Sequence, residues 1–405
     1  MKRRIALAGV SGLLLASVAL TGCGQRNTPA APSGGGAAKK VATIGVIAPL
    51  SGGLSAMGNG IKNSVDLAVR QANETNAIPG WELKFVAEDD QGQPDPGRNA
   101  ATKLVADKTL VGVVGPLNSS VGQAMQPVFE SAGIPLISSA NTNPSLTRGA
   151  DLANPKRAYS TYFRTCATDD VQGPFAAKYL LDEGIKEIAT IHDKKTYGAG
   201  LVGAFSEAFT KGGGTIVAAE TINPDDKDFS AVISKVKAAN PKLVYYGGEH
   251  PQAAPLSQQM KAAGLTIPLM GGDGIFDKAF IDLAGASASG DLATNVGAPA
   301  EALPTAAAFV AAYEKAGFSG GYGAYGIGSY DAGTALIEAL KVSLKDAGDA
   351  ESARKATVEA LNKVSFTGAS GKVSFDQYGD NTTRTLTVYK VENGEWKAVR
   401  TEDYK

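Results

Sequence analysis

Short apolar runs alternate with amphipathic segments along most of the chain. The run Val41–Leu50 is rich in β-formers and ends at a Ser-Gly-Gly turn, and apolar residues then recur at helical spacing from Ile61 to Ala72. A short continuous apolar run is typical of a buried strand, and a spacing of three to four residues is typical of an amphipathic helix. The same pattern predicts further strands at 82–88, 111–114 and 134–137, and helices around 101–105 and 121–128.

The same alternation restarts after Asp170. It predicts helices at 171–183, 201–210, 229–239 and 254–263, and strands at 187–192, 215–219, 243–246 and 267–270. Strands that alternate with helices form parallel sheets whose two faces are covered by the helices. Two such runs predict an α/β protein with two doubly wound lobes, and we expect the chain to cross between them near Arg164–Asp170.

The last hundred residues follow a different pattern. Two segments have helical spacing, 305–315 and 331–346, and two β-rich segments, Gly371–Phe375 and Thr385–Val391, are predicted to pair as a closing hairpin. Between them Gly320–Gly328 (GGYGAYGIG) is rich in glycine. This segment lacks the Lys-Ser/Thr pair of a phosphate-binding loop, so we expect an ordinary loop there.

The N-terminus predicts export. Three basic residues precede an uncharged, largely apolar run at 5–20, and Leu20-Thr21-Gly22-Cys23 has the form of a lipoprotein cleavage site. This arrangement is typical of a signal peptide, here residues 1–22, which is removed before lipid is attached to Cys23. The alternative is an ordinary secretory signal in which the cysteine is incidental. Residues 23–40, rich in Gly, Ala, Pro and Ser, are predicted to form a flexible tether.

Composition excludes several classes of function. The chain is 43% hydrophobic and 20% charged with a formal net charge of −1, so it has no basic excess for binding nucleic acid. Its two cysteines and two histidines argue against a disulfide framework and a His-rich metal site, and we expect Cys166 to be a buried small residue. No nucleophile elbow, metal-ligand spacing or Cys/His pair indicates an enzyme, and no cofactor is expected.

Polar clusters follow the predicted strands, where α/β proteins bind their ligands. In the first lobe Ser119 and Ser120 precede a helix, so one of them is expected to cap it, and a helix N-terminus also attracts a carboxylate. In the second lobe Asp273 stands among glycines, where it is either a turn residue or a partner for an ammonium group. Tyr197 is either a surface tyrosine or a cover for the cleft. Together these residues suggest a site for a zwitterion.

Several motifs occur in a fixed order: IAPLSGGLSAMG, VVGPLNSS, LISSANTNPSLT, FRTCATDDVQGPFAAKYL, IHDKKTYGAGL, LVYYGGEHP and LMGGDG. With them the chain resembles the type I periplasmic binding proteins, in the leucine/isoleucine/valine-binding branch that serves ABC transporters. The resemblance runs from Thr43 to Val388. It implies two α/β lobes joined by three crossovers that close around an amino acid. The expected N-terminal lobe is 41–165 plus 297–368, and the expected C-terminal lobe is 166–296 plus 369–405.

The resemblance also implies roles for individual residues. Ser119 would bind the α-carboxylate with help from Ala140 and Thr142. Asp273 would bind the α-ammonium, and Tyr197 would close over the ligand. The remaining candidates are Asp169, near the crossing, as a further acid for the amine, and Met57 and Glu249, which stand where the branch has tyrosines. For Glu249 three possibilities stay open: it contacts a more cationic ligand, faces solvent, or pairs with a lysine.

These observations predict a lipid-anchored substrate-binding protein of an ABC transporter, which is not an enzyme. It would bind an amino acid, expected to be Leu, Ile or Val, and deliver it to the permease subunits. We expect it to act as a monomer at the outer face of the cytoplasmic membrane or in the periplasm, without metal or nucleic acid. The alternative is a sensor of the same fold that detects amino acids or amides without transporting them.

Overall fold

The computed structural model describes residues 39–404, so the predicted signal peptide and Cys23 lie outside the described residues. The first segment alternates strands and helices as predicted. Its elements are β1 (Lys40–Ala48), α1 (Ser55–Glu74), β2 (Trp81–Asp89), α2 (Pro94–Val105), β3 (Leu110–Val114), α3 (Ser119–Ala132), β4 (Leu136–Ser138), α4 (Ser145–Arg148) and β5 (Tyr162–Arg164).

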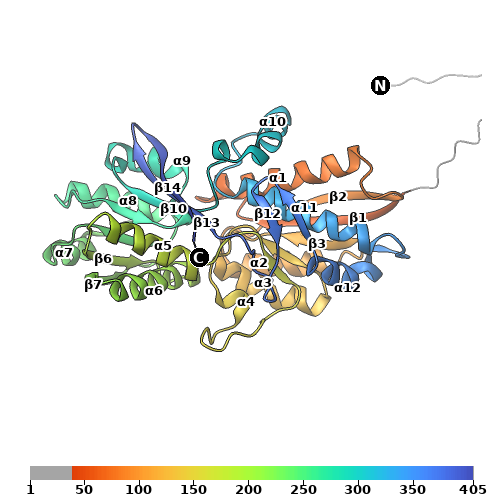
Figure 1. Cartoon of the computed structure of the whole chain (residues 1–405), viewed down its shortest axis with the longest axis horizontal. Coiled ribbons are helices and arrows are strands. Elements are labelled where there is room, and N and C mark those ends of the chain that lie inside the picture. Colours follow the sequence, from red (N-terminus) through yellow and green to blue (C-terminus); the bar gives the residue numbers. More distant parts are fainter. Residues whose placement is uncertain (1–38, 405) are drawn as a thin grey trace, which may run out of the picture. The chain divides into compact units, whose positions relative to one another are not determined.

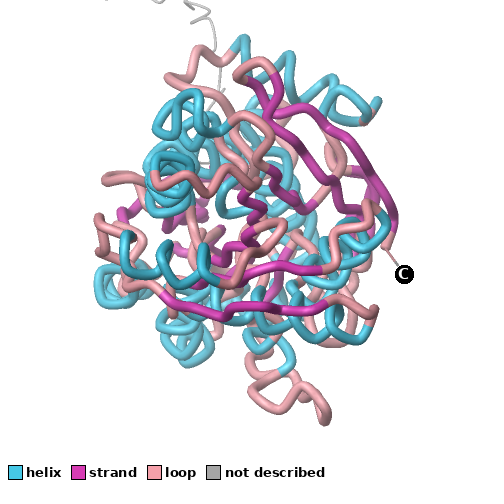
Figure 2. Tube along the Cα trace, turned by 90° about the vertical axis from the view of Figure 1, so that its left-hand side faces the viewer, coloured by secondary structure: helices cyan, strands magenta, loops and turns pink. Residues whose placement is uncertain are grey.

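The five strands form a parallel sheet in the order β2-β1-β3-β4-β5. Alternate residues of β1 face opposite sides: Ile44 and Val46 pack with α1, while Ile47 packs with α2 and α3. Because both faces are covered by helices, every residue of β3 (LVGVV) is buried. Figure 1 shows these helices around the sheet, and Figure 2 shows strands running between helices.

The second segment repeats the pattern. Its elements are α5 (Asp169–Asp182), β6 (Glu187–His192), α6 (Thr196–Lys211), β7 (Thr215–Thr221), α7 (Ser230–Ala238), β8 (Val244–Gly247), α8 (His250–Ala262), β9 (Leu269–Gly271), the short 3-10 turn Asp273–Ile275, α9 (Lys278–Ala284) and β10 (Leu292–Val296). The strands join a seven-stranded sheet in the order β14-β13-β10-β9-β8-β6-β7. Helices α5 and α6 pack on one face, and α7, α8 and α9 pack on the other.

The last segment returns to the first sheet and then to the second. Its elements are α10 (Ala307–Lys315), α11 (Gly326–Ser343), α12 (Ala350–Leu361), β11 (Ser365–Gly368), β12 (Gly371–Ser374), β13 (Thr385–Glu392) and β14 (Glu395–Asp403). Helices α11 and α12 cover the face of the first sheet beside α1, although they are far from it in sequence (Figure 1). The predicted loop Gly320–Gly328 is shorter than expected, because α11 already begins at Gly326.

The predicted closing hairpin is wrong. Strand β12 pairs with β11, and β13 pairs with β14 and β10, so two hairpins replace the single one. The expected boundary between residues 368 and 369 falls in the turn of the β11–β12 hairpin. Phe375, just after this hairpin, packs against Phe163 of β5 with ring centroids 5.1 Å apart. The chain therefore packs on the first lobe as far as Phe375.

The chain crosses between the two sheets three times, after β5, after β10 and after β12. The predicted fold class, two α/β lobes joined by three crossovers, is confirmed. Hereafter the first lobe is the five-stranded sheet with α1–α4 and α10–α12, and the second lobe is the seven-stranded sheet with α5–α9. Within residues 39–404, no helix combines the length and the apolar character that crossing a membrane requires.

One glycine fixes how α1 packs at the carboxyl edge of the first sheet. A β-carbon on Gly58 would lie 2.0 Å from the carbonyl oxygen of Pro49, so only glycine allows the first turn of α1 to pack on the loop that follows β1. This packing places the start of α1 at the carboxyl edge of the sheet, where β3 and β4 also end.

Candidate functional site

The two lobes contact each other along the carboxyl edges of their sheets. His250 Nε2 lies 3.0 Å from the carbonyl oxygen of Gly53. Asn143 Nδ2 donates to the carbonyl oxygen of Thr196 at 2.7 Å, and the Thr196 hydroxyl lies 3.2 Å from Gln123 Oε1. Each bond joins one lobe to the other, so the lobes are closed on each other.

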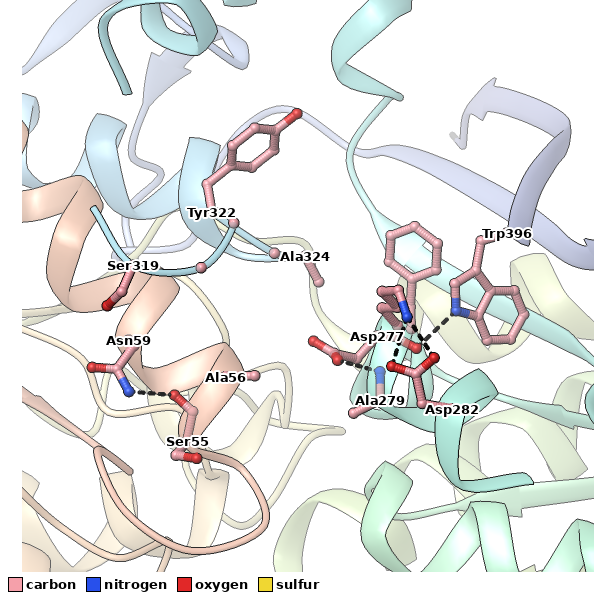
Figure 3. A pocket seen from close by; sticks show the side chains of 15 residues that line it. Ser55, Ala56, Asn59, Asp277, Ala279, Asp282, Ser319, Tyr322, Ala324 and Trp396 are labelled. Carbon is pink, nitrogen blue, oxygen red and sulfur yellow. Dashed lines mark hydrogen bonds and ion pairs between the residues drawn. The ribbon is translucent and has the colours of Figure 1, made fainter. Parts of the chain in front are cut away.

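A groove of about 710 Å³ opens beside this contact. Figure 3 shows Ser55, Asn59 and Ser319 on one side of it and Asp277 and Trp396 on the other. None of the eight ligand-binding residues predicted from the sequence lines the groove. All eight are buried, and two of them, Asp273 and Glu249, accept hydrogen bonds across the contact between the lobes.

Asp273 is held by three donors from different elements. It follows β9 and is 1% exposed. Tyr197 at the start of α6 donates its hydroxyl to Oδ1 at 2.8 Å, and Gln172 of α5 donates Nε2 to the same oxygen at 2.9 Å. Tyr325, just before α11, donates its hydroxyl to Oδ2 at 2.8 Å. Because Tyr325 belongs to the first lobe, Asp273 is one point at which the lobes are joined.

Burial governs the protonation of this group. It raises the pKa of Asp273, and the hydrogen bonds from Gln172 and the two tyrosines oppose that rise without cancelling it. Burial, followed by the nearby charge of Asp273, raises the pKa values of Tyr197 and Tyr325 well above the ordinary tyrosine value. Both phenols therefore remain protonated and able to donate.

Asp169 is a second buried carboxylate beside the first. It is the first residue of α5 and is fully buried, and its Oδ1 lies 3.4 Å from the Nε2 of Gln172 that also bonds Asp273. Its Oδ2 has no hydrogen-bond partner. Burial, followed by the charge of Asp273, raises the pKa of Asp169 well above its ordinary value. Every donor found for the two carboxylates among residues 39–404 is neutral.

Hydroxyl groups gather on the first lobe. Ser119 opens α3, and its Oγ lies 3.5 Å from the backbone nitrogen of Asn143. Thr142 is fully buried and its Oγ1 has no partner, while its carbonyl oxygen accepts from the backbone nitrogen of Asp169 at 2.8 Å. Ala140 is buried two residues earlier. The structure thus brings Ser119, Ala140 and Thr142 into one loop cluster beside Asp169.

The expectation that Ser119 or Ser120 caps α3 is wrong. Asn118 is the N-cap residue and both serines lie in the first turn, with no side chain capping the helix. The side chain of Asn118 instead contacts the second lobe, where its Nδ2 donates to Glu249 Oε1 at 2.7 Å.

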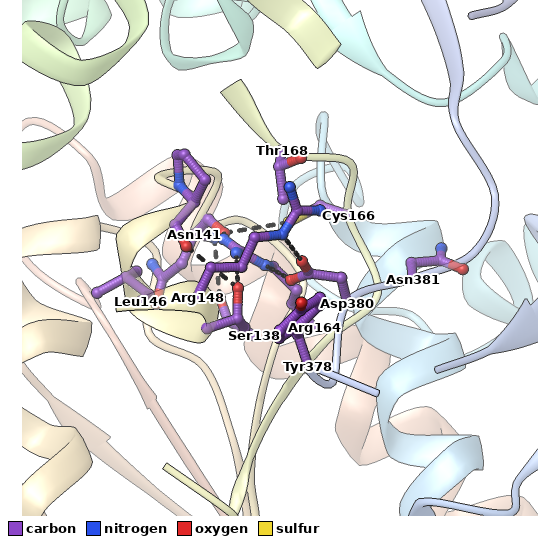
Figure 4. A network of polar contacts seen from close by, with 12 residues as sticks. Ser138, Asn141, Leu146, Arg148, Arg164, Cys166, Thr168, Tyr378, Asp380 and Asn381 are labelled. Carbon is purple, nitrogen blue, oxygen red and sulfur yellow. Dashed lines mark hydrogen bonds and ion pairs between the residues drawn. The ribbon is translucent and has the colours of Figure 1, made fainter. Parts of the chain in front are cut away.

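The Thr142 loop is positioned by a buried arginine. Arg164 ends β5 and is fully buried, and its Nη1 donates to the carbonyl oxygens of Asn141 and Asn143 at 2.7 and 2.8 Å, on either side of Thr142. Its Nε pairs with Asp380 Oδ1 at 2.6 Å. Arg148 pairs with the other oxygen of Asp380 at 3.0 Å (Figure 4). Asp380 lies on the third crossing, so this network fastens two crossings to the site.

Glu249 is buried and paired. It is the N-cap residue of α8 and 2% exposed, and besides the bond from Asn118 its Oε2 lies 3.1 Å from Lys195 Nζ. Of the three possibilities left open by the sequence, solvent exposure is excluded and a lysine pair is present. Met57 is also buried and belongs to the same apolar cluster as Ala140 and Tyr325.

Sequence reasoning missed Gln172 and Tyr325. Gln172 lies within a predicted helix that has no polar motif, and Tyr325 lies in the glycine-rich segment that we interpreted only as a loop. The bonds they make span 101 and 52 residues of chain. The second tyrosine of GGYGAYG, an aromatic residue in a loop between the lobes, is the one signal that could have pointed to Tyr325.

Comparison with known proteins identifies close relatives. A family model described as periplasmic binding protein matches residues 41–395. The Leu/Ile/Val-binding protein BraC3 of Rhizobium johnstonii is 33% identical over 353 residues, which cover 87% of this chain and 92% of that protein. The leucine-, isoleucine-, valine-, threonine-, and alanine-binding protein of Pseudomonas aeruginosa is 32% identical, with 89% of this chain and 91% of that protein covered.

Solved structures of similar fold include two amino-acid-binding proteins. A leucine-binding protein, LivK, from Thermotoga maritima has a TM-score of 0.78 at 26% identity, with 89% of this chain and 98% of that chain covered. The branched-chain amino acid transporter substrate-binding protein LivJ from Streptococcus pneumoniae, in complex with isoleucine, also has a TM-score of 0.78 at 26% identity, with 90% and 99% covered. The resemblance predicted from the sequence motifs is confirmed.

The first prediction concerns the stability that the folded protein loses by burying Asp169. Its raised pKa means that the folded protein holds a proton that the unfolded chain releases near pH 3.8, so the stability of the ligand-free protein falls as pH rises above that value. Asp169→Asn should therefore raise the free energy of unfolding at pH 7 by about 1 kcal/mol, with no gain at pH 4. Urea unfolding of protein stripped of ligand measures this.

Asp331→Asn is the matched control for Asp169→Asn. Asp331 is equally buried, but it accepts hydrogen bonds from the backbone nitrogens of Ala369 and Ser370 at 2.7 and 2.8 Å. An amide would place a donor against one of these donors, so Asp331→Asn should lower stability. A loss of stability in Asp169→Asn at pH 7 would contradict the assignment of Asp169 as a destabilising group.

The second prediction concerns the Arg164 network. Asp380→Asn would leave a buried guanidinium without its counter-charge and should lower the free energy of unfolding by about 3 kcal/mol at pH 7. Burial raises the pKa of Asp380, but the charge of Arg164 and its hydrogen bond outweigh it and hold this pKa below its ordinary value. The difference in the free energy of unfolding between Asp380→Asn and the wild type should therefore shrink as pH falls below about 4.

The matched control for Asp380→Asn is Asp282→Asn, which removes an exposed pair with Lys278. It should change stability by less than about 0.5 kcal/mol. If the two variants lose the same free energy of unfolding in urea, the pairing of Asp380 with Arg164 does not stabilise the fold.

Proposed function

The chain belongs to the periplasmic binding protein family, and from that premise we propose that it captures an α-amino acid between its lobes and delivers it to the permease subunits of an ABC transporter. The observation that carries this proposal is the pair Asp169 and Asp273. Both carboxylates are buried at the contact between the lobes, and all of their donors among the described residues are neutral.

A buried carboxylate without a cation costs several kcal/mol, which an incoming ammonium group would offset. Asp169 Oδ2, which has no partner, is free to accept from such a group. The α-ammonium of an amino acid supplies both the positive charge and the hydrogen-bond donors. We therefore assign Asp169 and Asp273 to the ammonium end of the ligand.

The carboxylate end of the ligand is assigned to the first lobe. Ser119 lies in the first turn of α3, where backbone N–H groups and the positive end of the helix dipole favour an anion. The unpartnered hydroxyl of Thr142 is a further donor. An α-amino acid would thus be held by opposite charges at its two ends.

Closure would couple binding to transport. Tyr325 and Asn143 of the first lobe bond Asp273 and Thr196 of the second, and these bonds exist only when the lobes are together. A ligand that contacts both lobes shifts the population toward this closed form. The permease would then accept the closed, loaded protein, and the protein itself would carry out no chemistry on the amino acid.

The place of action follows from the N-terminus and the family. We propose that lipid on Cys23 anchors the protein outside the cytoplasmic membrane and that the predicted tether, residues 23–40, links this anchor to the first lobe. The names of the relatives from Rhizobium and Pseudomonas favour an aliphatic amino acid such as leucine, isoleucine or valine.

The third prediction tests the ammonium site. Asp273→Ala should weaken amino-acid binding by about 2 to 5 kcal/mol, or roughly 30-fold to several thousand-fold in Kd, because a charged partner is lost in a closed cleft. Isothermal titration of ligand-stripped protein against the twenty amino acids measures this. Asp182→Ala, on an exposed position of α5 in the same lobe, is the control and should bind as the wild type does. Equal affinities in Asp273→Ala and wild type would contradict the assignment.

The fourth prediction tests the anchor. Cys23→Ser should move the protein from the membrane fraction to the soluble extracytoplasmic fraction, because the lipid can no longer be attached. Fractionation and immunoblotting measure this, with Cys166→Ser as the control for loss of a thiol. Retention of Cys23→Ser in the membrane fraction would exclude lipid on Cys23 as the anchor.

A further inference from the structure

We infer that the end of the cleft around Glu249 recognises a ligand side chain that carries N–H donors, either a primary amide or a cationic nitrogen. This inference rests on the proposed amino-acid binding and specifies the class of amino acid. It departs from the ligands named for the relatives, which are aliphatic amino acids and threonine, and it is carried by the polar groups of Glu249, Asn118, Asp193 and Lys195.

Topology places Glu249 in the ligand cleft. It follows β8, and Asp273 follows β9, which is the neighbouring strand of the same parallel sheet. Both residues therefore leave the sheet at its carboxyl edge. Across the cleft Glu249 accepts from Asn118, the residue directly before Ser119. Glu249 thus lies beside both proposed binding ends.

The groups around Glu249 have more acceptor capacity than donors. Each oxygen of Glu249 accepts one hydrogen bond, from Asn118 or from Lys195, whereas a carboxylate offers about four acceptor sites. Asn118 Oδ1 and Asp193 Oδ2 are buried and accept no hydrogen bond. Burial, followed by the charge of Glu249, raises the pKa of Asp193 to about 7, so the two carboxyl groups face each other. Unpartnered buried acceptors cost free energy, so the site favours a ligand that brings donors.

Asp193 adjoins the Glu249 backbone. It follows β6, which pairs with β8, and a β-carbon on Gly248 would lie 3.0 Å from Asp193 Oδ2. Its other carboxylate oxygen accepts from the backbone nitrogen of Lys195 at 3.0 Å. Among the described residues Lys195 is the one cation within ion-pair distance of Glu249, while two acidic side chains, Glu249 and Asp193, lie here, so this end of the cleft carries no surplus of positive charge.

These features discriminate among ligand side chains. A branched aliphatic side chain brings no donor and would leave the acceptors unpartnered. An anionic side chain would be repelled by Glu249 and Asp193. An amide or cationic nitrogen meets acceptors on both lobes at once, because Asn118 belongs to the first lobe and Glu249 to the second. Sites built to hydrogen-bond a substrate group reject analogues that lack it more strongly than apolar pockets reject a missing methylene.

The test compares amino acids of nearly equal shape by isothermal titration of the ligand-stripped protein. Asparagine is compared with leucine and aspartate, glutamine with methionine and glutamate, and lysine, ornithine and arginine are included. At least one donor-bearing amino acid should bind 30-fold or more tightly than leucine, isoleucine and valine. Tighter binding of these three would overturn the inference and leave the proposed function standing, whereas binding of no amino acid would overturn both.

A variant of Glu249 tests whether this residue is the source of the preference for ligands that carry N–H donors. Glu249→Gln keeps the size of the side chain but removes its charge, and it should lower the affinity for the preferred donor-bearing ligand by tenfold or more while reducing discrimination against the acidic isostere. Glu220→Gln is the matched control, because Glu220 forms a 2.9 Å pair with Lys235 on β7 and α7, away from the cleft. Unchanged discrimination in a folded Glu249→Gln protein would overturn the inference.

Discussion

Two buried carboxylates, Asp169 and Asp273, share the amide of Gln172 and have no positively charged partner among the described residues. Much of the cleft is arranged around that constraint. Gln172 of α5, Tyr197 of α6 and Tyr325, just before α11, donate to Asp273, and Tyr325 reaches it from the opposite lobe. Neutral donors reduce the cost of the charge but cannot replace a cation. Under the proposed function, the closed form is favoured most when a ligand brings the positive charge that the protein omits.

At the crossings between the lobes, in contrast to the cleft, buried charges have partners of opposite sign. Arg164 and Arg148 both pair with Asp380, so charges buried near the crossings are matched within the protein. The same arginine fixes the carbonyl groups on either side of Thr142. A matched network holds its geometry with or without ligand, whereas the unmatched carboxylates respond to it. In the proposed function the protein thus combines crossings of fixed geometry with a cleft whose free energy depends on whether ligand is bound.

Local patterns predicted the alternating strands and helices and the two-lobed fold, because parallel sheets covered on both faces leave strong apolar runs. Those patterns carry no information about which strand pairs with which, so β12 and β13 were wrongly paired with each other. The candidates on strand ends, such as Ser119 and Asp273, were predictable because each follows a buried strand. Gln172 and Tyr325 were not, since their roles arise from contacts over 101 and 52 residues. The environment of Glu249 likewise depends on Lys195 and Asn118, which only the fold brings together.

The threefold crossing of the chain also constrains the order in which an exported polypeptide can fold. The core on one face of β1 contains Ile44 and Val46 together with Leu340 of α11 and Leu361 of α12. Helix α1 therefore covers only part of that face, and the rest stays uncovered until residue 361 has left the secretion channel. The second lobe cannot close its sheet until β13 and β14 follow. Neither lobe is complete when its first segment emerges, and contacts this distant in sequence form slowly. Folding is therefore expected largely after translocation, during an interval in which apolar strands are exposed and chaperones outside the membrane would find their binding sites.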